Sequence, residues 1–310
     1  MPAKYCSATP MTDAFRSGFV AIIGRPNVGK STLLNRLVGQ KVSITSHRPQ
    51  TTRHRILGIH TTDAAQLVYV DTPGVHRGER GRQLNRMMNR EASVSLEGVD
   101  AVVLVITADG WNENDEPALE LVRRAQCPVI LAINKVDKLD DRERLLPLIE
   151  ESQKRLAFVE IVPLSARAGD NVPDLEKAIV RLLPEHPPYF EPDQVTDRSE
   201  RFLAAEFVRE QVFRGLGQEL PYAVAVEITE FREEPKHLHI DAVIWVEKEG
   251  QKAILIGKDG ERLKSIGRQA RLGMQKAFGR KVWLGLWVKV REGWSDDVRA
   301  LRSLGYGEDG

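Results

Sequence analysis

The chain has 310 residues, of which 42% are hydrophobic and 29% are charged. This length fits about two domains, and the composition supplies enough apolar material for folded cores. No apolar run approaches the roughly 20 residues of a membrane-spanning helix, and residues 1–18 lack the apolar stretch of a secretory signal. Cys6 and Cys127 are the only cysteines, which excludes a disulfide scaffold and a four-cysteine zinc site and favours a reducing cytosol.

The net charge of +1 hides an uneven distribution of charge. Residues 252–291 contain eleven Lys and Arg residues and two acidic residues, so this segment carries +9 and the rest of the chain carries −8. A basic block on an otherwise acidic chain predicts a polyanionic partner for that segment alone.

The first half of the chain alternates short apolar runs with helical patterns. After a first run beginning at Phe19, the apolar runs are Leu67–Val70, Ala101–Ile106, Pro128–Ile133 and Phe158–Val162, and the helical stretches are Lys30–Val38, Arg80–Leu96, Glu116–Ala125, Asp141–Ala157 and Val172–Leu182. This alternation predicts an α/β domain whose mostly parallel sheet is covered by helices on both faces. Arg55–Thr61 and Gln66–Val70 flank a short turn, which predicts a hairpin with one antiparallel strand at the sheet edge.

A phosphate-binding loop follows the first strand. Residues 24–31, GRPNVGKS, match the pattern G-x-x-x-x-G-K-[ST]. Backbone N–H groups of such a loop and of the helix after it can surround a triphosphate, while Lys30 reaches the β- and γ-phosphates and Ser31 ligates Mg²⁺. We expect the whole loop to bind nucleotide: Gly24, Arg25, Pro26, Asn27, Val28, Gly29, Lys30 and Ser31. Asn27 is also a candidate for holding a monovalent cation, K⁺, at the phosphates.

Two further elements are expected to sense the γ-phosphate. Residues 71–74, DTPG, end a strand, so Asp71 can act on Mg²⁺ through water and Ser31, and the N–H of Gly74 can approach the γ-phosphate. Residues 50–54, QTTRH, contain a threonine that should ligate Mg²⁺, and of the two we favour Thr52. Together these segments predict a switch that triphosphate orders and hydrolysis releases. The nucleotide contacts predicted here are Asp71, Thr72, Pro73 and Gly74, and the magnesium ligands are Ser31, Thr52 and Asp71.

The predicted reaction is transfer of the γ-phosphoryl group to water, in which positioning and electrostatics carry the catalysis. We assign it to Lys30, Thr52, Asp71 and Gly74. The residue after Gly74 is Val75, which cannot orient a water molecule, and we interpret His76 as solvated surface. The sequence therefore predicts slow intrinsic hydrolysis that a partner or a cation accelerates.

A guanine-binding loop follows the buried run that ends at Ile133. In residues 134–137, NKVD, the carboxylate of Asp137 can accept two hydrogen bonds that guanine offers and adenine does not. Asn134 can tie this loop to the phosphate loop, and the stem of Lys135 can lie on the ring. Residues 164–166, LSA, follow the next strand and bring Ser165 and Ala166 to the base. The sequence therefore predicts specificity for GTP and GDP.

A proline-rich segment separates two domains. Four prolines lie within residues 184–192, and such a segment is stiff and cannot continue a helix. Beyond it the pattern predicts a helix, two strands, a short apolar run, a helix and a strand, at Ser199–Leu216, Tyr222–Phe231, Leu238–Val246, Ala253–Ile256, Asp259–Phe278 and Val282–Val290. We expect a tail over 1–16, a GTPase domain over 17–183, a linker over 184–197, an RNA-binding domain over 198–294 and a C-terminal tail over 295–310.

The basic block contains a G-x-x-G loop at residues 257–260, GKDG, directly before a basic helix. Two glycines let a nucleic-acid backbone approach closely, and the helix N-terminus adds its positive dipole end. This arrangement resembles a type 2 KH domain, whose loop clamps about four nucleotides of a single strand. The predicted RNA contacts are Gly257, Lys258, Asp259, Gly260, Arg262, Lys264, Arg268 and Arg271. We expect Trp283 and Trp287, which share one face of the last strand, to pack rather than to stack on bases.

The GTPase motifs, their spacing and the second domain together resemble the Era family of bacterial ribosome-assembly GTPases, over 18–294. The resemblance implies that residues 50–54 and 71–74 are the two switches, and that a hydrophobic residue at Val75 is the family pattern. It further implies a monomer that binds the 3′ end of the 16S rRNA, acts as a GTP-gated checkpoint in assembly of the 30S subunit, and works in the cytoplasm with weak peripheral attachment to the inner membrane. In this reading the linker repositions the KH domain when GTP binds.

Three other interpretations stay open at this point. The chain fits a GTPase of another class, such as a tRNA-modification factor with a different RNA target, although its second domain lacks cysteine. It also fits a non-enzymatic RNA-binding scaffold, because no side chain near the second switch activates water. A basic surface can bind anionic lipid as well as RNA, which is the third alternative.

Overall fold

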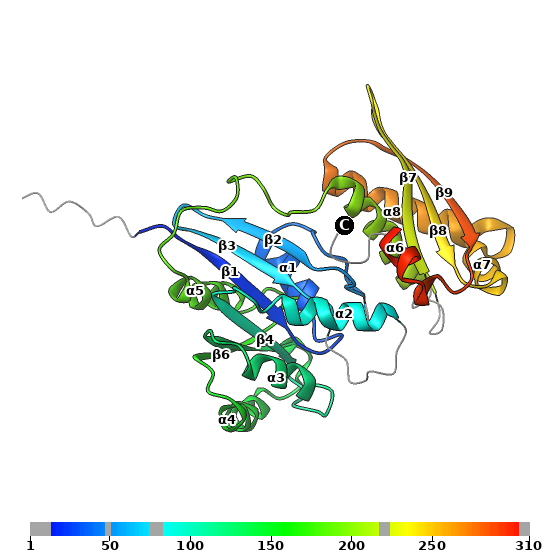
Figure 1. Ribbon diagram of the computed structural model, residues 1–310. Coiled ribbons are helices and arrows are strands. Elements are labelled where there is room, and N and C mark those ends of the chain that lie inside the picture. The colour runs from blue at the N-terminus through cyan, green and yellow to red at the C-terminus, as the bar shows by residue number, and fades with distance from the viewer. Residues whose placement is uncertain (1–13, 47–50, 75–82, 217–223, 304–310) are drawn as a thin grey trace, which may run out of the picture.

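The structure, a computed structural model, describes residues 14–46, 51–74, 83–216 and 224–303. Two separate sheets lie side by side, one built from the first half of the chain and one from the second (Figure 1). The predicted tail over 1–16 lies almost entirely outside the described residues. No helix within these ranges is both long and apolar enough to cross a membrane.

The first sheet has six strands in the order β2-β3-β1-β4-β5-β6. The β2–β3 pair is antiparallel and every other pair is parallel, so the predicted edge hairpin is confirmed. Strands β3 and β4 are buried along their whole length, which explains why they read as continuous apolar runs. The bounds are β1 Arg16–Ile23, β2 Ile56–Thr61, β3 Ala65–Asp71, β4 Ala101–Thr107, β5 Val129–Asn134 and β6 Glu160–Leu164.

Helices cover both faces of this sheet, as the alternation of strands and helices predicts. Leucines and isoleucines of α1 (Lys30–Val38) and α5 (Val172–Leu182) pack on one face. The apolar sides of α3 (Glu116–Arg123) and α4 (Leu145–Arg155) pack on the other. The expected helix 141–157 is interrupted: a 3₁₀ turn spans Arg142–Arg144 before α4 begins. Helix α2 spans Gln83–Val94.

The proline-rich segment lies along the edge hairpin of the first sheet. Gln66 of β3 holds it at three points: its Oε1 accepts hydrogen bonds from the backbone N–H of Tyr189 (2.7 Å) and Phe190 (2.9 Å), and its Nε2 donates to the carbonyl of Phe190 (2.8 Å). Further along, the Oδ1 of Asp197 accepts from the N–H of Leu57 at 3.0 Å. These contacts fix the segment to the first domain rather than leaving it as a free connection.

The second sheet has three strands in the order β7-β8-β9, with β7–β8 antiparallel and β8–β9 parallel. Its bounds are β7 Val224–Glu234, β8 His237–Val246 and β9 Val282–Val290. The helices α6 (Glu200–Gly215) and α8 (Glu261–Phe278) pack on one face of it and complete one apolar core. The hydroxyl of Ser199 caps α6 by accepting from the N–H of Phe202. The apolar run 253–256 belongs to a helix, α7 (Glu249–Ile256), that the sequence analysis did not predict as one.

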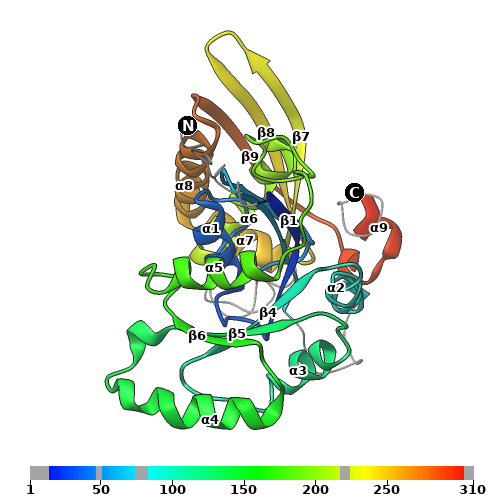
Figure 2. The same cartoon turned by 90° about the vertical axis from the view of Figure 1, so that its left-hand side faces the viewer.

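The chain returns to the first domain after β9. A 3₁₀ turn at Trp294–Asp296 and the short helix α9 (Val298–Ser303) form a small cluster with α2 and β7, in which Met88, Trp294 and Leu301 are almost completely buried. Figure 2 shows α9 beside α2. The expectation of a C-terminal tail from 295 onward is therefore wrong for residues 295–303, because they fold into a turn and a helix that Leu301 packs against α2 and β7.

Candidate functional site

The phosphate-binding loop connects β1 to α1 at the carboxyl end of the sheet (Figure 1). The backbone φ angles are 156° at Gly24 and 104° at Gly29. A Cβ would lie 2.4 Å from the carbonyl oxygen of Val105 at the first position and 2.3 Å from Nδ2 of Asn134 at the second. Both glycines are therefore required by space as well as by conformation. Because α1 begins at Lys30, the free N–H groups of its first turn open onto the loop.

Lys30 is buried beneath this loop. Its Nζ donates hydrogen bonds to the carbonyl oxygens of Gly24 (2.9 Å) and Arg25 (3.0 Å). Burial lowers the pKa of Lys30 to about 8; the Asp71 carboxylate opposes this shift and Arg25 adds to it. A bound phosphate would supply the negative charge that this ammonium group lacks, which fits the role predicted for Lys30.

The end of β3 gathers hydroxyl groups around one carboxylate oxygen. The Oδ2 of Asp71 accepts hydrogen bonds from Ser31 (2.9 Å), Ser43 (2.9 Å) and Thr52 (3.5 Å). Burial raises the pKa of Asp71, while Lys30 and the three hydroxyls oppose that rise. Ser43 is a member of this group that sequence reasoning missed, because a lone serine in a polar loop carries no signal.

The three predicted magnesium ligands, Ser31, Thr52 and Asp71, meet at this point. Of the two neighbouring threonines it is Thr52 that faces the site, since its Oγ1 lies 2.8 Å from Oγ of Ser31. The second oxygen of Asp71, Oδ1, is buried and accepts no hydrogen bond from any described residue. An all-oxygen donor set with one unsatisfied carboxylate oxygen fits a hydrated Mg²⁺ ion. When bound, the ion would neutralise charge that develops on the phosphates.

Gly74 lies directly against the phosphate-binding loop. A Cβ on Gly74 would lie 2.9 Å from the backbone N and 2.8 Å from Cγ of Pro26, so the second switch touches the phosphate loop directly. Gln50 of the first switch, together with Val75 and His76 after Gly74, lies outside the described residues.

The guanine-binding loop is fixed to the phosphate loop by side chains. The Nδ2 of Asn134 donates to the carbonyl of Val28 at 2.7 Å, and its Oδ1 accepts from the N–H of Ala166 at 3.0 Å. The Nζ of Lys135 donates to the carbonyl of Asn27 at 2.6 Å. Asn134 thus joins three loops that are far apart in the sequence, and it is buried while doing so.

Asp137, in the predicted guanine-binding loop, lines an open pocket between this loop and the phosphate loop. Its Oδ1 accepts a hydrogen bond of 2.6 Å from Oγ of Ser165, so Ser165 orients the group predicted to bind guanine. The open pocket beside it has a volume of about 590 Å³ and runs from Asp137 and Lys135 to Gly29 and Thr32 on the phosphate side. The geometry therefore places the predicted base site and the predicted phosphate site in one continuous cavity.

Two residues of the phosphate-loop and switch motifs direct their side chains elsewhere. The guanidinium of Arg25 binds Oγ1 of Thr107 (2.9 Å) and Oδ1 of Asp115 (3.0 Å), which anchors the loop to the end of β4. The hydroxyl of Thr72 donates to the carbonyl of Ile22 at 3.0 Å. Only the backbone atoms of these two residues remain available to a nucleotide.

The second domain lines part of the predicted nucleotide pocket. Phe213 and Arg214, at the end of α6, line the same cavity as Asn134, Lys135 and Asp137. Sequence reasoning missed both residues, because they lie almost 80 positions beyond the guanine-binding loop and match no nucleotide-binding motif.

The described part of the first switch and the loop before it contact the second domain at several points. Glu210, which is fully buried, accepts from the backbone N–H of Thr45 at 3.0 Å and forms an ion pair with Lys41. Arg209 donates to the carbonyl of Thr51 at 2.6 Å, and Arg53 donates to the carbonyl of Val224 at 2.8 Å. The segment that carries Thr52 therefore touches both the magnesium site and the second domain.

His54 is partly buried in this interface and packs edge-on against Phe202 at 5.2 Å between ring centroids. Burial lowers the pKa of His54 to about 3, although Glu206 opposes this shift. The imidazole is therefore neutral at physiological pH, and it acts as a packing group rather than as a charge.

The G-x-x-G loop joins α7 to α8. Gly257 and Gly260 have φ of 72° and 74°, and Asp259 between them has φ of 51°. A Cβ on Gly257 would lie 2.8 Å from Cβ of Arg262, so the backbone passes close to the first turn of α8. Lys258 and Asp259 are exposed at its tip.

The structure divides the predicted RNA-binding residues between two surfaces. A groove of about 470 Å³ runs between α8 and β9 and is lined by Lys264, Arg268 and Arg271 together with Gly260 and Trp283. The remaining basic residues face α6 instead. They line a second cleft that includes Lys258, Arg262 and Arg214, and the guanidinium of Arg262 is held by the carbonyl of Ile254 at 2.6 Å.

That Trp283 and Trp287 pack rather than stack on bases stays a prediction: the ring of Trp283 does pack on His239, at 4.2 Å between centroids, but neither tryptophan is buried in the core. Their exposed fractions are 45% and 47%, because the alternation of β9 turns both side chains away from α6 and α8. One of them, Trp283, lines the groove beside α8, where an exposed ring can stack on a base.

Comparisons with known proteins identify the family. A model of 50S ribosome-binding GTPases matches residues 19–135, and a KH-domain model matches residues 219–295. GTPase Era of Marinobacter nauticus is 56% identical over 299 residues, covering 96% of this chain and 98% of that protein. GTPase Era of Pseudomonas aeruginosa is 56% identical over 294 residues, covering 94% and 96%.

Two solved structures agree with this. A variant of Aquifex aeolicus Era bound to GDP and AlF₄⁻ and an Era complex with MgGDPNP and nucleotides 1506–1542 of 16S ribosomal RNA each match with a TM-score of 0.90 and 42% identity. Each match covers 95% of this chain and all of the other. The chain therefore belongs to the Era family of GTPases.

Proposed function

We propose that this protein binds and hydrolyses GTP with Mg²⁺, and that GTP controls its grip on the single-stranded 3′ end of 16S rRNA during assembly of the 30S subunit. The observation that carries the proposal is the double attachment of the first switch. Thr52 lies 2.8 Å from Ser31 at the magnesium site, while Thr51 next to it accepts a hydrogen bond from Arg209 of the second domain.

This attachment supplies a route for coupling the two sites. A segment that must be ordered to ligate Mg²⁺ is also the segment that α6 holds, so loss of the γ-phosphate would release contacts in both domains. We assign the coupling to the first switch rather than to the linker, because hydrogen bonds to residues such as Gln66, Leu57 and Ile59 hold the linker against the first domain.

The groove between α8 and β9 is the proposed RNA site. Lys264, Arg268 and Arg271 recur at helical spacing along its α8 wall, and Gly267 lets α8 approach β9 so closely that a Cβ there would lie 3.2 Å from Leu286. The basic wall suits the phosphates and the apolar floor with Trp283 suits unstacked bases. The RNA of the Era complex with nucleotides 1506–1542 of 16S rRNA supports the choice of target.

Hydrolysis is proposed to depend on Lys30, Thr52, Asp71 and the N–H of Gly74, which position GTP and stabilise charge on its phosphates. Asn27 has φ of 64° in the loop and its side chain borders the cavity, so we propose that it helps to hold K⁺. Equal hydrolysis rates in potassium and sodium salts would contradict the role of K⁺ and leave that of Mg²⁺ intact.

The proposal is tested by measuring RNA binding in the two nucleotide states. The probe is a labelled oligonucleotide that copies the 3′ end of 16S rRNA, with a scrambled sequence as control, and the protein carries a non-hydrolysable GTP analogue or GDP. We expect tight, sequence-dependent binding favoured by the analogue. Arg268→Ala should weaken it, whereas Lys276→Ala, on the same helix outside the groove, should not.

Equal binding of both oligonucleotides in both states would refute the proposed target and the gating. We place the protein in the cytoplasm as a monomer. Peripheral attachment to the inner membrane is tested by measuring binding to anionic vesicles. If RNA displaces the protein from the vesicles, lipid and RNA bind to the same basic surface.

A further inference from the structure

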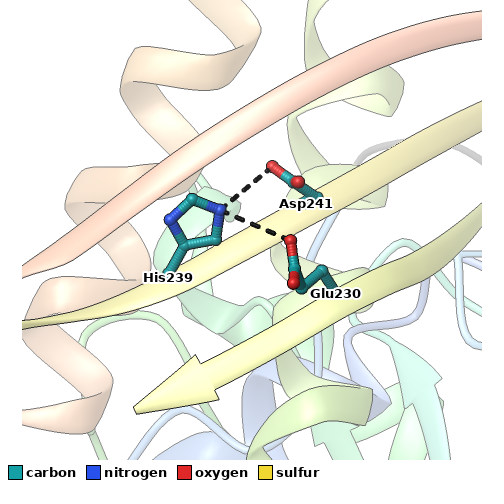
Figure 3. Close-up of side chains that lie close together, drawn as sticks. All are labelled: Glu230, His239 and Asp241. Carbon is teal, nitrogen blue, oxygen red and sulfur yellow. Dashed lines mark ion pairs between the residues drawn. The ribbon is translucent and has the colours of Figure 1, made fainter. Parts of the chain in front are cut away.

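Three metal-ligating side chains converge on the face of the second sheet that points away from α6 and α8. The Nε2 of His239 lies 3.7 Å from Oε2 of Glu230 and 3.6 Å from Oδ1 of Asp241 (Figure 3). One ligand atom from each residue falls within 4.8 Å of the other two. The cluster belongs neither to the nucleotide cavity nor to the groove beside α8, so nothing described so far accounts for it.

The strand register explains why these residues meet. Asp241 pairs with Glu230 across the β7–β8 ladder, and a bulge between Ile228 and Glu230 puts Glu230 in the place that Thr229 would otherwise take. His239 lies two residues before Asp241 and shares its face. The bulge therefore brings a second carboxylate to the imidazole, as bulges near functional sites often do.

Neighbouring residues hold two of the three groups in place. The ring of His239 stacks on Trp283 with 4.2 Å between centroids and 15° between planes. The Nε of Arg232 binds Oε1 of Glu230 at 2.7 Å, which leaves Oε2 directed at His239. Partners of this kind fix the orientation of metal ligands.

The third group, Asp241, has an unsatisfied oxygen. Its Oδ1 is buried and accepts no hydrogen bond from the described part of the chain. The residue paired with it on β9 is Gly285, and a Cβ there would lie 2.5 Å from that oxygen. A Cβ at Gly285 would also lie 2.7 Å from Cη2 of Trp287, so the glycine lets both the carboxylate and that ring lie close to β9. A buried carboxylate oxygen without a donor is costly unless a cation satisfies it.

We propose that Glu230, His239 and Asp241 form a binding site for a divalent transition-metal ion of the Zn²⁺ class, with water completing the coordination. An imidazole with two carboxylates suits zinc, whereas Mg²⁺ and Ca²⁺ take oxygen ligands. Zinc bonds of about 2.0–2.2 Å place neighbouring ligand atoms about 3.4 Å apart. The observed separations of 3.6 and 3.7 Å reach that value with small side-chain rotations.

The test uses the full chain without an affinity tag, saturated with GDP and excess Mg²⁺ so that the nucleotide site is filled. Zn²⁺ is titrated by calorimetry, and Co²⁺ is titrated by its ligand-field absorption. We expect one equivalent to bind per chain. His239→Gln and Asp241→Asn should each weaken binding by more than about tenfold. The matched control is His237→Gln, a histidine on the same strand that lies outside the cluster and should leave the affinity unchanged.

GDP affinity is measured for every variant and shows whether the chain is still folded. The proposal is overturned if Zn²⁺ does not bind saturably, because the three side chains then interact only with one another and with their protein neighbours. It is also overturned if His237→Gln weakens binding as much as His239→Gln does, since adventitious binding to surface histidines would then explain the result.

Discussion

The guanidinium of Arg209, in the second domain, donates a hydrogen bond of 2.6 Å to the carbonyl oxygen of Thr51, in the first. The same guanidinium binds both carboxylate oxygens of Glu206, at 2.7 and 2.5 Å, and both side chains are buried. Burial by itself would raise the pKa of Glu206, but Arg209 outweighs that effect and the pKa lies below its usual value. One ion pair inside α6 thus supports the contact between a switch and the neighbouring domain.

Replacing Arg209 with methionine should destabilise the folded protein by about 3–5 kcal/mol, because Glu206 then keeps a buried charge without its partner. Urea unfolding measures this loss. The double variant Arg209→Met with Glu206→Leu should recover most of the stability, since no charge remains buried. It should not recover the preference of RNA for the GTP-analogue state, because the bond to Thr51 is still missing.

Gly29→Ala should impair folding and nucleotide binding more than Gly39→Ala does. Both residues have positive φ, 104° and 76°, but a Cβ at Gly29 would meet Asn134 at 2.3 Å whereas nothing lies within 4 Å of one at Gly39. The control variant, Gly39→Ala, should lose about 1 kcal/mol of stability from conformation alone. Gly29→Ala should lose more stability and should also lose nucleotide affinity. Similar losses in thermal unfolding would show that the contact with Asn134 is unimportant.

Asn134→Ala should reduce both the stability of the first domain and its affinity for GDP. The change removes the bonds to Val28 and Ala166 and leaves their buried partner groups unsatisfied, at a cost of at least about 2 kcal/mol. Calorimetry with GDP and urea unfolding report the two effects separately. An affinity equal to that of the unchanged protein would mean that the three loops keep their arrangement without this side chain.

The ion pair between His60 on β2 and Glu176 on α5, 3.5 Å apart, should make stability depend on pH. Hydrogen bonding to Glu176 raises the pKa of His60 above its usual value of 6.5. The pair therefore stabilises the fold fully below pH 6.5, and this contribution is lost as pH rises through the raised value. It should amount to less than about 1 kcal/mol, because both groups are partly exposed. The melting temperature of the unchanged protein should therefore contain a decline with rising pH that His60→Gln lacks. Parallel curves of melting temperature against pH for the two proteins would exclude this contribution of the ion pair.

Leu301→Ala should destabilise the protein by about 2–5 kcal/mol, the usual cost of a cavity at a buried leucine, because Leu301 is fully buried against α2 and β7. Val298→Ala is the control, since Val298 lies on the same helix and is 44% exposed. Equal stabilities of the two variants would show that α9 is not packed in solution.

The meeting of the predicted nucleotide-binding segments could largely be foreseen from the sequence, because the motifs are local. Each one follows a buried strand, so the parallel sheet brings the segments beginning at Gly24, Asp71 and Asn134 to one edge. The contacts of Arg209 with Thr51 and of Phe213 with the guanine pocket were not predictable. Each joins residues far apart in the sequence, and neither leaves a local pattern in either segment.

The second domain shows a different limit. Period-two alternation correctly places Trp283 and Trp287 on one face of β9, but it cannot say which face packs on the helices. Only the position of α8 settles that, and α8 contacts the other face. The helix at 298–303 was missed because six residues are too few for a periodic signal, although Leu301 anchors it.

The packing of Trp294 and α9 against α2 has a mechanical consequence. The two domains are connected covalently through the segment after residue 183. They are connected a second time by packing contacts, where the end of the chain returns to α2. When the contacts of the first switch with the second domain are released, a body held at these two separated points keeps one easy rotation, about the line that connects them. Cutting the chain after Arg291 would remove the second connection, and the second domain could then rotate about more than one axis. The tip of α8 would then sweep through a cone of orientations instead of a single arc.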